Sequence, residues 1–270
     1  MKRNQILATL LATAALQMFG WGQKGHDTTA YIAECHLTPA AKAMVDSLLD
    51  GKSLVYYANW PDNACYTEPY AYTKTWHYKN IEEGEEYAKA KDIPEGTIVT
   101  ALNSRIDVLN DPASTRDEKW LALVLTVHFL GDIHQPMHMG RYVDRGGNRH
   151  NIKFFGSGTN LHTVWDTRLP EAAHKWSYTE WQNNIDRATP EEEKAIVAGG
   201  TPYSWGEETY EICKKVYEAT PEGTNVAYDY IADWTPTIEL QYLRGGLRLA
   251  DILNTVFDPE YQPLNGMNLR

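Results

Sequence analysis

Residues 128–138 read His-Phe-Leu-Gly-Asp-Ile-His-Gln-Pro-Met-His, and an unbroken, mostly apolar stretch from Glu118 to Val127 leads into them. Thr115 and Glu118 have the spacing of a capping box, which predicts that a helix begins near residue 116. Pro136 lacks the backbone donor that would continue this helix, so it should end or kink the helix. The stretch therefore predicts a long buried helix with histidines gathered at its end.

The polar side chains at the end of this helix are spaced as metal ligands are. His128 and Asp132 are four residues apart and lie on one helical face. His138 follows the predicted break and can turn back toward the same cavity. Histidines near a helix end are often solvated and favoured by the helix dipole. Here, however, His128 and Asp132 continue an apolar helix, and a buried carboxylate needs a partner such as a metal ion.

The same spacing occurs a second time. Residues 160–166 read Asn-Leu-His-Thr-Val-Trp-Asp, so His162 and Asp166 are again four residues apart. One such pair is a weak motif. Two pairs separated by a glycine-rich segment indicate a site that holds more than one metal ion.

Composition and charge limit the function further. The chain has 270 residues, enough for one large domain or two small ones, and a formal net charge of −11. Such an acidic chain is a poor candidate for binding nucleic acid through a basic surface. If it acts on phosphates, bound cations must supply the positive charge.

The first 20 residues have the form of a secretory signal peptide. Lys2 and Arg3 provide the charged start, and an apolar run follows from Ile6. The run is short for a membrane span, and no later segment is long and apolar enough to be one. Removal of this segment takes away two positive charges, so the formal net charge goes from −11 to −13. We expect cleavage after Gly20 and a mature protein that is secreted or periplasmic, with no membrane anchor.

The chain contains three cysteines, Cys35, Cys65 and Cys213. One disulfide is possible in an oxidising compartment, and the sequence does not say which pair would form it. No Cys-x-x-Cys motif occurs, so a structural thiolate zinc site is not indicated.

Most of the remaining chain is predicted to be helical. The clearest predicted helices cover residues 38–51, 94–110, 207–219 and 235–257. Thr235 is the expected N-cap of the last one, with Pro236 in its first turn. Gly245 and Gly246 inside that helix would allow a bend or close packing.

The sequence predicts little sheet. Polar and apolar residues alternate sufficiently over residues 150–156 to predict a short strand that forms half of a hairpin. We expect His150 to be solvated. No internal repeat or low-complexity linker is present. We therefore predict one domain over residues 21–270, all-α apart from a short β-hairpin.

The order of the motifs resembles the trinuclear-zinc single-strand nucleases, a family with fungal extracellular and plant bifunctional members. Their fold is shared with bacterial zinc-dependent phospholipase C. The resemblance is carried by Trp-Gly-x-x-Gly-His at residue 21, Trp-Pro-Asp, His-Tyr, His-Phe-Leu-Gly-Asp-x-x-Gln-Pro-x-His, Gly-Gly-Asn and Asn-Leu-His-x-x-Trp-Asp.

The resemblance implies three zinc ions per chain, with Asp132 bridging two of them. The ligands implied for the three ions in turn are Asp62, His77, His128 and Asp132; His138, His162 and Asp166; and Trp21, His26 and Asp132. Trp21 would bind through its amino group and carbonyl oxygen, which requires cleavage after Gly20. His134 has no role in this scheme and is expected to lie behind the ligands or at the surface.

The resemblance also implies residues that contact the substrate. Tyr78 would stack on a base, although a core tyrosine is an equal alternative, and Asn80 stands where the family has a base-binding carboxylate. Many members carry Lys or Arg three residues after the metal-binding Asp, where this chain has Cys65. Lys79 or Arg145 could supply the missing charge.

The implied enzyme is a phosphodiesterase and endonuclease that hydrolyses single-stranded RNA and DNA to 5′-phosphorylated products, with 3′-nucleotidase activity. A metal-activated hydroxide would attack phosphorus while Asp62 orients the water or takes its proton. We expect it to act as a monomer. Two alternatives remain: a zinc-dependent phospholipase C, and a zinc-binding envelope protein without catalysis.

Overall fold

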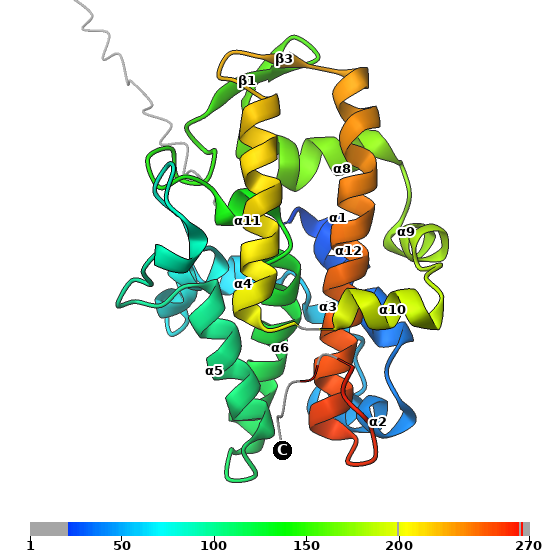
Figure 1. Cartoon of the computed structure of the whole chain (residues 1–270). Helices are drawn as coiled ribbons and strands as arrows, with labels where there is room; N and C mark the ends of the chain where they lie inside the picture. The colour runs from blue at the N-terminus through cyan, green and yellow to red at the C-terminus, as the bar shows by residue number, and fades with distance from the viewer. Residues whose placement is uncertain (1–20, 199, 265, 267–270) are drawn as a thin grey trace, which may run out of the picture.

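Two long helices, α6 and α12, form the centre of the molecule (Figure 1). In the computed structural model, which describes residues 21–198, 200–264 and 266, α6 spans Arg116–Asp132 and α12 spans Tyr228–Phe257. Helix α1 packs against both of them, and α5 packs along α6. The predicted signal peptide, residues 1–20, lies outside the described residues.

Within the described residues, the other elements are helices of three to 18 residues and one small sheet. In chain order they are α1 (Gln23–Cys35), α2 (Pro39–Leu48), α3 (Leu54–Tyr57), α4 (Trp60–Ala64), the 3-10 helices η1 (Ala71–His77) and η2 (Tyr87–Lys89), α5 (Ile98–Asn110), the 3-10 helix η3 (Pro136–Met139), β1 (Asn151–Phe154), β2 (Ser157–Asn160), α7 (Leu161–Thr163), the π-helical turn η4 (Val164–Arg168), α8 (Leu169–Ala173), α9 (Tyr178–Ile185), α10 (Pro190–Val197), α11 (Pro202–Ala219) and β3 (Asn225–Val226). The predicted mostly helical fold with little sheet is confirmed.

Helix α6 is built as the sequence predicts. The Thr115 hydroxyl accepts from the backbone of Glu118, and the Glu118 side chain accepts from the backbone of Thr115, which completes the capping box. Every residue from Ala122 to Asp132 is buried, because neighbouring helices cover all sides of this half of α6. The helix ends before Pro136, as expected, and the chain enters η3. The last turn of α6 is therefore a rigid, water-poor support for polar side chains.

The prediction for the start of α12 is wrong. The helix begins seven residues before Thr235, and Pro236 lies inside it. Thr235 is not an N-cap: its hydroxyl donates back to the carbonyl of Ile231 at 2.6 Å. Packing of α12 against α1, α8 and α10 keeps the chain helical through a residue that would end an isolated helix.

Close packing between α12 and α1 depends on glycine. A Cβ atom at Gly246 would lie 2.5 Å from side-chain atoms of Ile32, and one at Gly245 would lie 2.9 Å from Thr29. These two positions let α1 approach α12 more closely than any side chain would allow. The close packing predicted for the glycine pair is thus present.

The sheet has three strands in the order β2-β1-β3, and it covers the ends of α11 and α12 at the top of Figure 1. The predicted hairpin is β1 paired antiparallel with β2, with Asn151 opposite Asn160. Strand β3 adds a parallel edge too short to be read from the sequence. The expectation that His150 is solvated is wrong: it is buried, and its Nε2 lies 2.7 Å from the carbonyl oxygen of Thr220.

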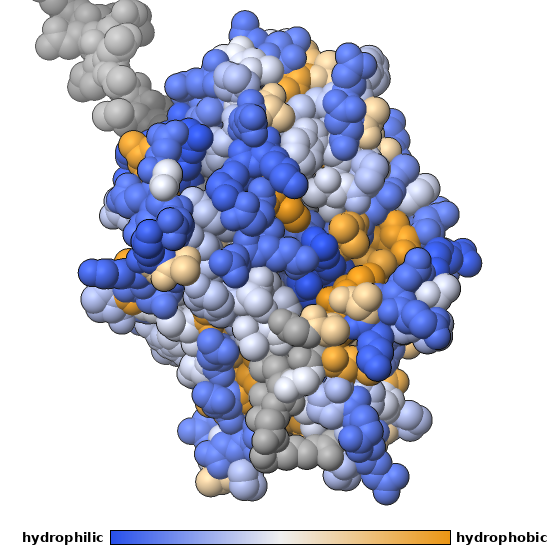
Figure 2. All heavy atoms as spheres, viewed as in Figure 1, coloured by the Kyte–Doolittle hydropathy of each residue, from blue (hydrophilic) through white to orange (hydrophobic). Residues whose placement is uncertain are grey.

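The visible surface in Figure 2 is mostly hydrophilic, in keeping with the acidic composition. An apolar patch lies beside α10, where Leu243 and Ile196 border a smaller core cluster. Along the part of the chain that the structure describes, no helix has both the length and the apolar character needed to cross a bilayer. The three cysteines are all free thiols, so the possible disulfide is not formed.

Candidate active site

The nine predicted metal ligands converge from distant parts of the chain, and all nine residues are buried. They are Trp21 just before α1, His26 on α1, Asp62 on α4, His77 at the end of η1, His128 and Asp132 on α6, His138 on η3, His162 on α7 and Asp166 on η4. The last turn of α6 lies at the centre of this arrangement.

Asp132 is the residue around which the others are placed. Its Oδ2 atom is 3.0 Å from Nδ1 of His77 and 3.0 Å from Nε2 of His128. Its Oδ1 atom is 3.3 Å from Nε2 of His26 and 3.4 Å from Nδ1 of His138. One fully buried carboxylate thus faces four imidazoles, two at each of its oxygen atoms.

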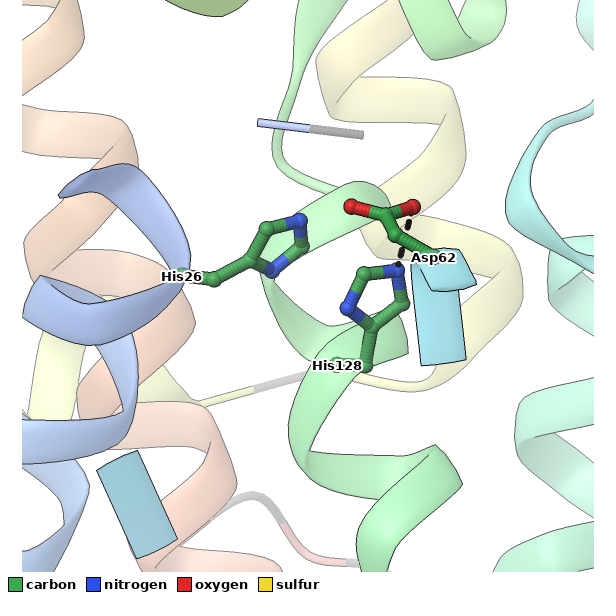
Figure 3. A group of neighbouring side chains, drawn as sticks. All are labelled: His26, Asp62 and His128. Atoms are coloured by element: carbon green, nitrogen blue, oxygen red, sulfur yellow. Dashed lines mark ion pairs between the residues drawn. The ribbon is translucent and has the colours of Figure 1, made fainter. Parts of the chain in front are cut away.

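A first cluster lies on the side of Asp132 nearest α4. Oδ1 of Asp62 is 3.3 Å from Nε2 of His128 and 3.6 Å from Nδ1 of His77. Figure 3 shows the rings of His26 and His128 facing each other beside the Asp62 carboxylate, and their centroids are 3.9 Å apart. The ligand atoms of His26, Asp62 and His128 therefore also lie close enough for one ion, a grouping that the sequence did not suggest.

A second cluster contains His138, His162 and Asp166, whose ligand atoms all lie within 4.8 Å of one another. Nε2 of His162 is 3.0 Å from Oδ2 of Asp166, and Nε2 of His138 is 3.9 Å from Oδ1. The side-chain amide of Gln135 donates to the same Oδ1 atom. Gln135 was not predicted as a site residue, although it belongs to the stretch on which the prediction rests.

Backbone carbonyls orient three of the imidazoles. Nδ1 of His128 lies 2.7 Å from the oxygen of Ala58, and Nδ1 of His162 lies 2.6 Å from that of Gly146. Nδ1 of His138 lies 2.6 Å from the oxygen of His77. A carbonyl can only accept, so each Nδ1 carries the proton and each Nε2 is left as a metal-ligating atom. Sequence alone could not identify these carbonyls, because any residue type supplies one.

The electrostatics of the two clusters differ. Burial raises the pKa of Asp166 to about 7, against the lowering effect of His162 and Gln135. Burial would also lower the pKa of His128, but the carboxylates of Asp132 and Asp62 outweigh it and raise this pKa well above 6.5. The same attraction holds the pKa of Asp132 well below 3.8, although burial opposes it. In the first cluster, the protonated imidazole of His128 therefore supplies positive charge that a bound cation could supply instead.

Several buried polar atoms of the site have no hydrogen-bond partner. They are Nδ1 of His26 and Nε2 of His77, and also Nε2 of His26 and Oδ1 of Asp132, which face each other at 3.3 Å without forming a hydrogen bond. A buried polar atom without a partner costs about 1–3 kcal/mol, and proteins rarely tolerate several together. Imidazole nitrogens and carboxylate oxygens without thiolates are a donor set that suits zinc. The residues present therefore fit divalent metal ions.

A model of the family described as S1/P1 Nuclease matches residues 21–258, which includes every residue of both clusters. The chain belongs to the S1/P1 nuclease family. It is therefore a hydrolase that acts on phosphodiester bonds of nucleic acids, and its fold is the helical, phospholipase C-like fold of that family. The predictions of family and enzyme class are confirmed.

Individual relatives agree with this assignment to the S1/P1 family. Endonuclease 1 of Arabidopsis thaliana is 27% identical over 287 residues, which cover 95% of this chain and 93% of that protein. Nuclease S1 of Aspergillus oryzae is 32% identical over 176 residues, covering 62% of this chain and 60% of that protein. Nuclease P1 of Penicillium citrinum is 27% identical over 273 residues, covering 89% of this chain and 99% of that protein.

The start of α1 in this S1/P1 nuclease is held beside the second cluster. The indole of Trp21 is buried and packs edge-on against Tyr242, with ring centroids 4.8 Å apart. The N–H of Gly22 donates to the carbonyl of Asp166 at 2.8 Å. The backbone next to Trp21 is therefore tied to the segment that carries a metal-ligand candidate.

Two cavities adjoin the clusters. A small one is lined by His77, His138 and His162 together with Tyr78 and other residues. A larger one, of about 770 Å³, is also lined by Tyr78, together with Asn80 and other residues. Tyr78 is half-buried and borders both, so it is a wall between cavities rather than a member of the hydrophobic core.

Three predictions about charged or polar neighbours can be compared with the structure. Lys79 cannot supply the missing charge, because it is buried with its Nζ 3.0 Å from Oδ1 of Asp92. Arg145 lines the larger cavity and does not line the small cavity beside His77, His138 and His162. His134 is not at the surface: it is buried behind α6, with Nε2 2.8 Å from Nη1 of Arg248.

Proposed function

We propose that this S1/P1 family member is an exported zinc enzyme that hydrolyses single-stranded RNA and DNA to 5′-phosphorylated products and also acts as a 3′-nucleotidase. Its functional domain would comprise residues 21–270, after removal of residues 1–20. The observation that carries the proposal is the position of Asp132, a buried carboxylate between two ligand clusters. A monomer suffices, because one chain supplies every proposed ligand.

Three zinc ions account best for the donor set. The first would take Asp62, His77, His128 and Asp132, and the second would take His138, His162 and Asp166. The third would take His26, the other oxygen of Asp132, and the amino group and carbonyl of Trp21. Nε2 of His26 and Oδ1 of Asp132 support this third position, because they lie 3.3 Å apart without forming a hydrogen bond.

The bound metal ions and the side chains around them would have different roles in the reaction. Bound zinc ions would acidify a water molecule and offset the charge of the phosphate. Asp62 reaches the cluster from α4 and is the residue that would orient the attacking water or accept its proton. Gln135 and the carbonyls behind the imidazoles hold the ligands in position, so that little reorganisation is needed during the reaction.

The cavities support a preference for single strands. A base that stacks on the ring of Tyr78 must leave the stack of a duplex, which costs least in single-stranded nucleic acid. Stacking on an aromatic ring contributes about 1–3 kcal/mol per base and tolerates most sequences. Asn80 also lines the larger cavity, where its side-chain amide could hydrogen-bond to a base.

The two alternative functions have less support. A protein that only stores zinc would not need the enzyme fold of a nuclease family. A phospholipase C would share the metal clusters, but the relatives quoted above are named as nucleases and endonucleases. We therefore retain the nuclease as the single proposed function.

The test uses mature protein that begins at Trp21. Zinc per chain would be counted by elemental analysis, and cleavage of a single-stranded and a duplex oligonucleotide would be followed with and without a chelator. About three zinc ions, chelator-sensitive cleavage of the single strand and 5′-phosphorylated products are expected. Hydrolysis of a choline phospholipid without nucleic-acid cleavage would contradict the proposal.

A further inference from the structure

A positively charged side chain lies at the metal-ligand side of Tyr78. The small cavity there is lined by Cys65, Tyr66, Lys74, His77, Tyr78, His138 and His162. Three of these residues are proposed zinc ligands from both clusters. Among the described residues that line this cavity, Lys74 is the one with a lysine or arginine side chain.

Lys74 is placed by η1 and by an aromatic ring. It lies one turn of the 3-10 helix before His77, so the same short helix carries the lysine and a proposed ligand. Its Nζ lies over the ring of Tyr66, 4.4 Å from the centroid. The ring attracts the ammonium without neutralising it, so the positive charge stays available to a ligand.

Carboxylates do not neutralise this lysine. Within residues 21–198, 200–264 and 266, Lys74 takes part in no ion pair, whereas Lys79 is paired with Asp92. The neighbouring Cys65 is buried, and its thiol donates to the carbonyl of Asp62 at 3.4 Å. Lys74 is thus a cation without an ion-pair partner among the described residues, at the edge of the small cavity.

We propose that Lys74 binds the phosphate group that is hydrolysed, at the opening of the small cavity that Tyr66 and the second ligand cluster line. The cavity itself, of about 10 Å³, has room for about one water molecule, whereas Lys74 and Tyr66 are exposed at its edge. The proposal rests on the proposed function, because it assumes that the phosphate reaches that cluster. The flexible four-carbon stem lets the ammonium move from the ring of Tyr66 to an anion at this opening. There it would offset charge that builds up on the phosphate oxygens during attack, beside the metal ions.

The test compares three variants of the zinc-loaded enzyme. Lys74→Met removes the charge and keeps the length of the side chain, and Lys74→Arg keeps the charge. The matched control is Lys52→Met, because Lys52 is also exposed and also lies over a tyrosine ring, at 4.1 Å from the centroid of Tyr56, but does not line the cavity.

Two readouts are needed. The first is kcat and KM on a single-stranded oligonucleotide, and the second is the dissociation constant for inorganic phosphate by calorimetry. Lys74→Met should lower kcat/KM by about 10- to 100-fold and weaken phosphate binding, at unchanged zinc content and Tm. Lys74→Arg should stay within a few-fold of the unaltered enzyme, and Lys52→Met should match it.

The outcomes separate this proposal from the proposed function. If the unaltered enzyme did not cleave nucleic acid, the proposed function would fail, and phosphate binding alone would still decide the role of Lys74. Phosphate affinity within twofold of the unaltered enzyme for Lys74→Met would overturn the proposal. Loss of zinc or of Tm in that variant would also overturn it, because Lys74 would then have a structural role.

Discussion

The Oδ2 atom of Asp132 lies 3.0 Å from the Nε2 atom of His128, one helical turn earlier on α6. The pair depends on one local feature, the helical spacing, and on one tertiary feature, the burial of α6. The spacing along one helix sets the distance between the two residues, and the burial of that helix makes their charges count.

Asp132→Asn should abolish most of the activity. The amide keeps the shape but loses the charge that lets one side chain face both clusters, so zinc content should fall below that of the unaltered protein and kcat should fall by about 1000-fold or more. Elemental analysis and a cleavage assay on the same sample would measure both. Asp117→Asn, an exposed change in the first turn of the same helix, is the control. Full zinc content in Asp132→Asn would refute the bridging role.

Gln135→Met should weaken metal binding at the second cluster. Gln135 is fully buried and donates to Asp166, so its loss should lower zinc affinity by about 10- to 100-fold without unfolding the chain. Competition with a zinc-sensitive dye would measure this. Gln182→Met is a matched control, because Gln182 donates to Asp186 at 2.8 Å outside both clusters. Equal zinc affinity in the two variants would argue against a positioning role for Gln135.

Tyr78→Ala should raise KM for single-stranded oligonucleotides, and Tyr78→Phe should not. Loss of about 1–3 kcal/mol of stacking corresponds to roughly 5- to 150-fold in affinity. Steady-state kinetics on one short oligonucleotide would measure KM for both variants. Tyr228→Ala, at an exposed tyrosine that does not line either cavity, is the control. If Tyr78→Phe were as impaired as Tyr78→Ala, the hydroxyl rather than the ring would be the important group.

A separate ion pair should make stability depend on pH. Nε2 of His36 lies 3.0 Å from both carboxylate oxygens of Asp186, and Glu193 lies 3.9 Å from Nδ1. The hydrogen bond from His36 to Asp186 raises the pKa of His36 above 6.5. Burial alone would raise the pKa of Asp186, but hydrogen bonds from His36 and Gln182 lower it below 3.8.

The sign of the pH effect follows from these two directions. Because the folded pKa of His36 is raised, its contribution to stability is complete below pH 6.5 and is lost as the pH rises through the folded value. The contribution of Asp186 is present above pH 3.8 and is lost as the pH falls through its lowered value. His36→Gln should therefore lower Tm by roughly 2–4 °C at pH 5 and by much less at pH 9. Thermal denaturation at both pH values would measure this, and an equal loss at both would show that packing rather than charge is involved.

The local features of the site could be predicted from sequence because they depend on neighbours in the chain. The capping box of Thr115 and Glu118 and the apolar run after it determine where α6 begins and that it is buried. The four-residue spacing then places His128 and Asp132 on one face without reference to the rest of the fold. The hairpin of β1 and β2 was also predictable, because its alternation and turn are local.

Other features depend on contacts between distant segments, and only the tertiary structure decides them. The position of His26 beside His128 follows from the packing of α1 on α6, and the helical state of Pro236 follows from the packing of α12. His134 and His150 are buried because distant residues, Arg248 and the carbonyl of Thr220, provide their partners. The sequence by itself thus determined the family, the main helices and the types of side chain that gather at the candidate site. Which side chains meet, which are buried and which lysine remains unpaired were decided by tertiary packing, because burial and pairing are properties of the assembled chain.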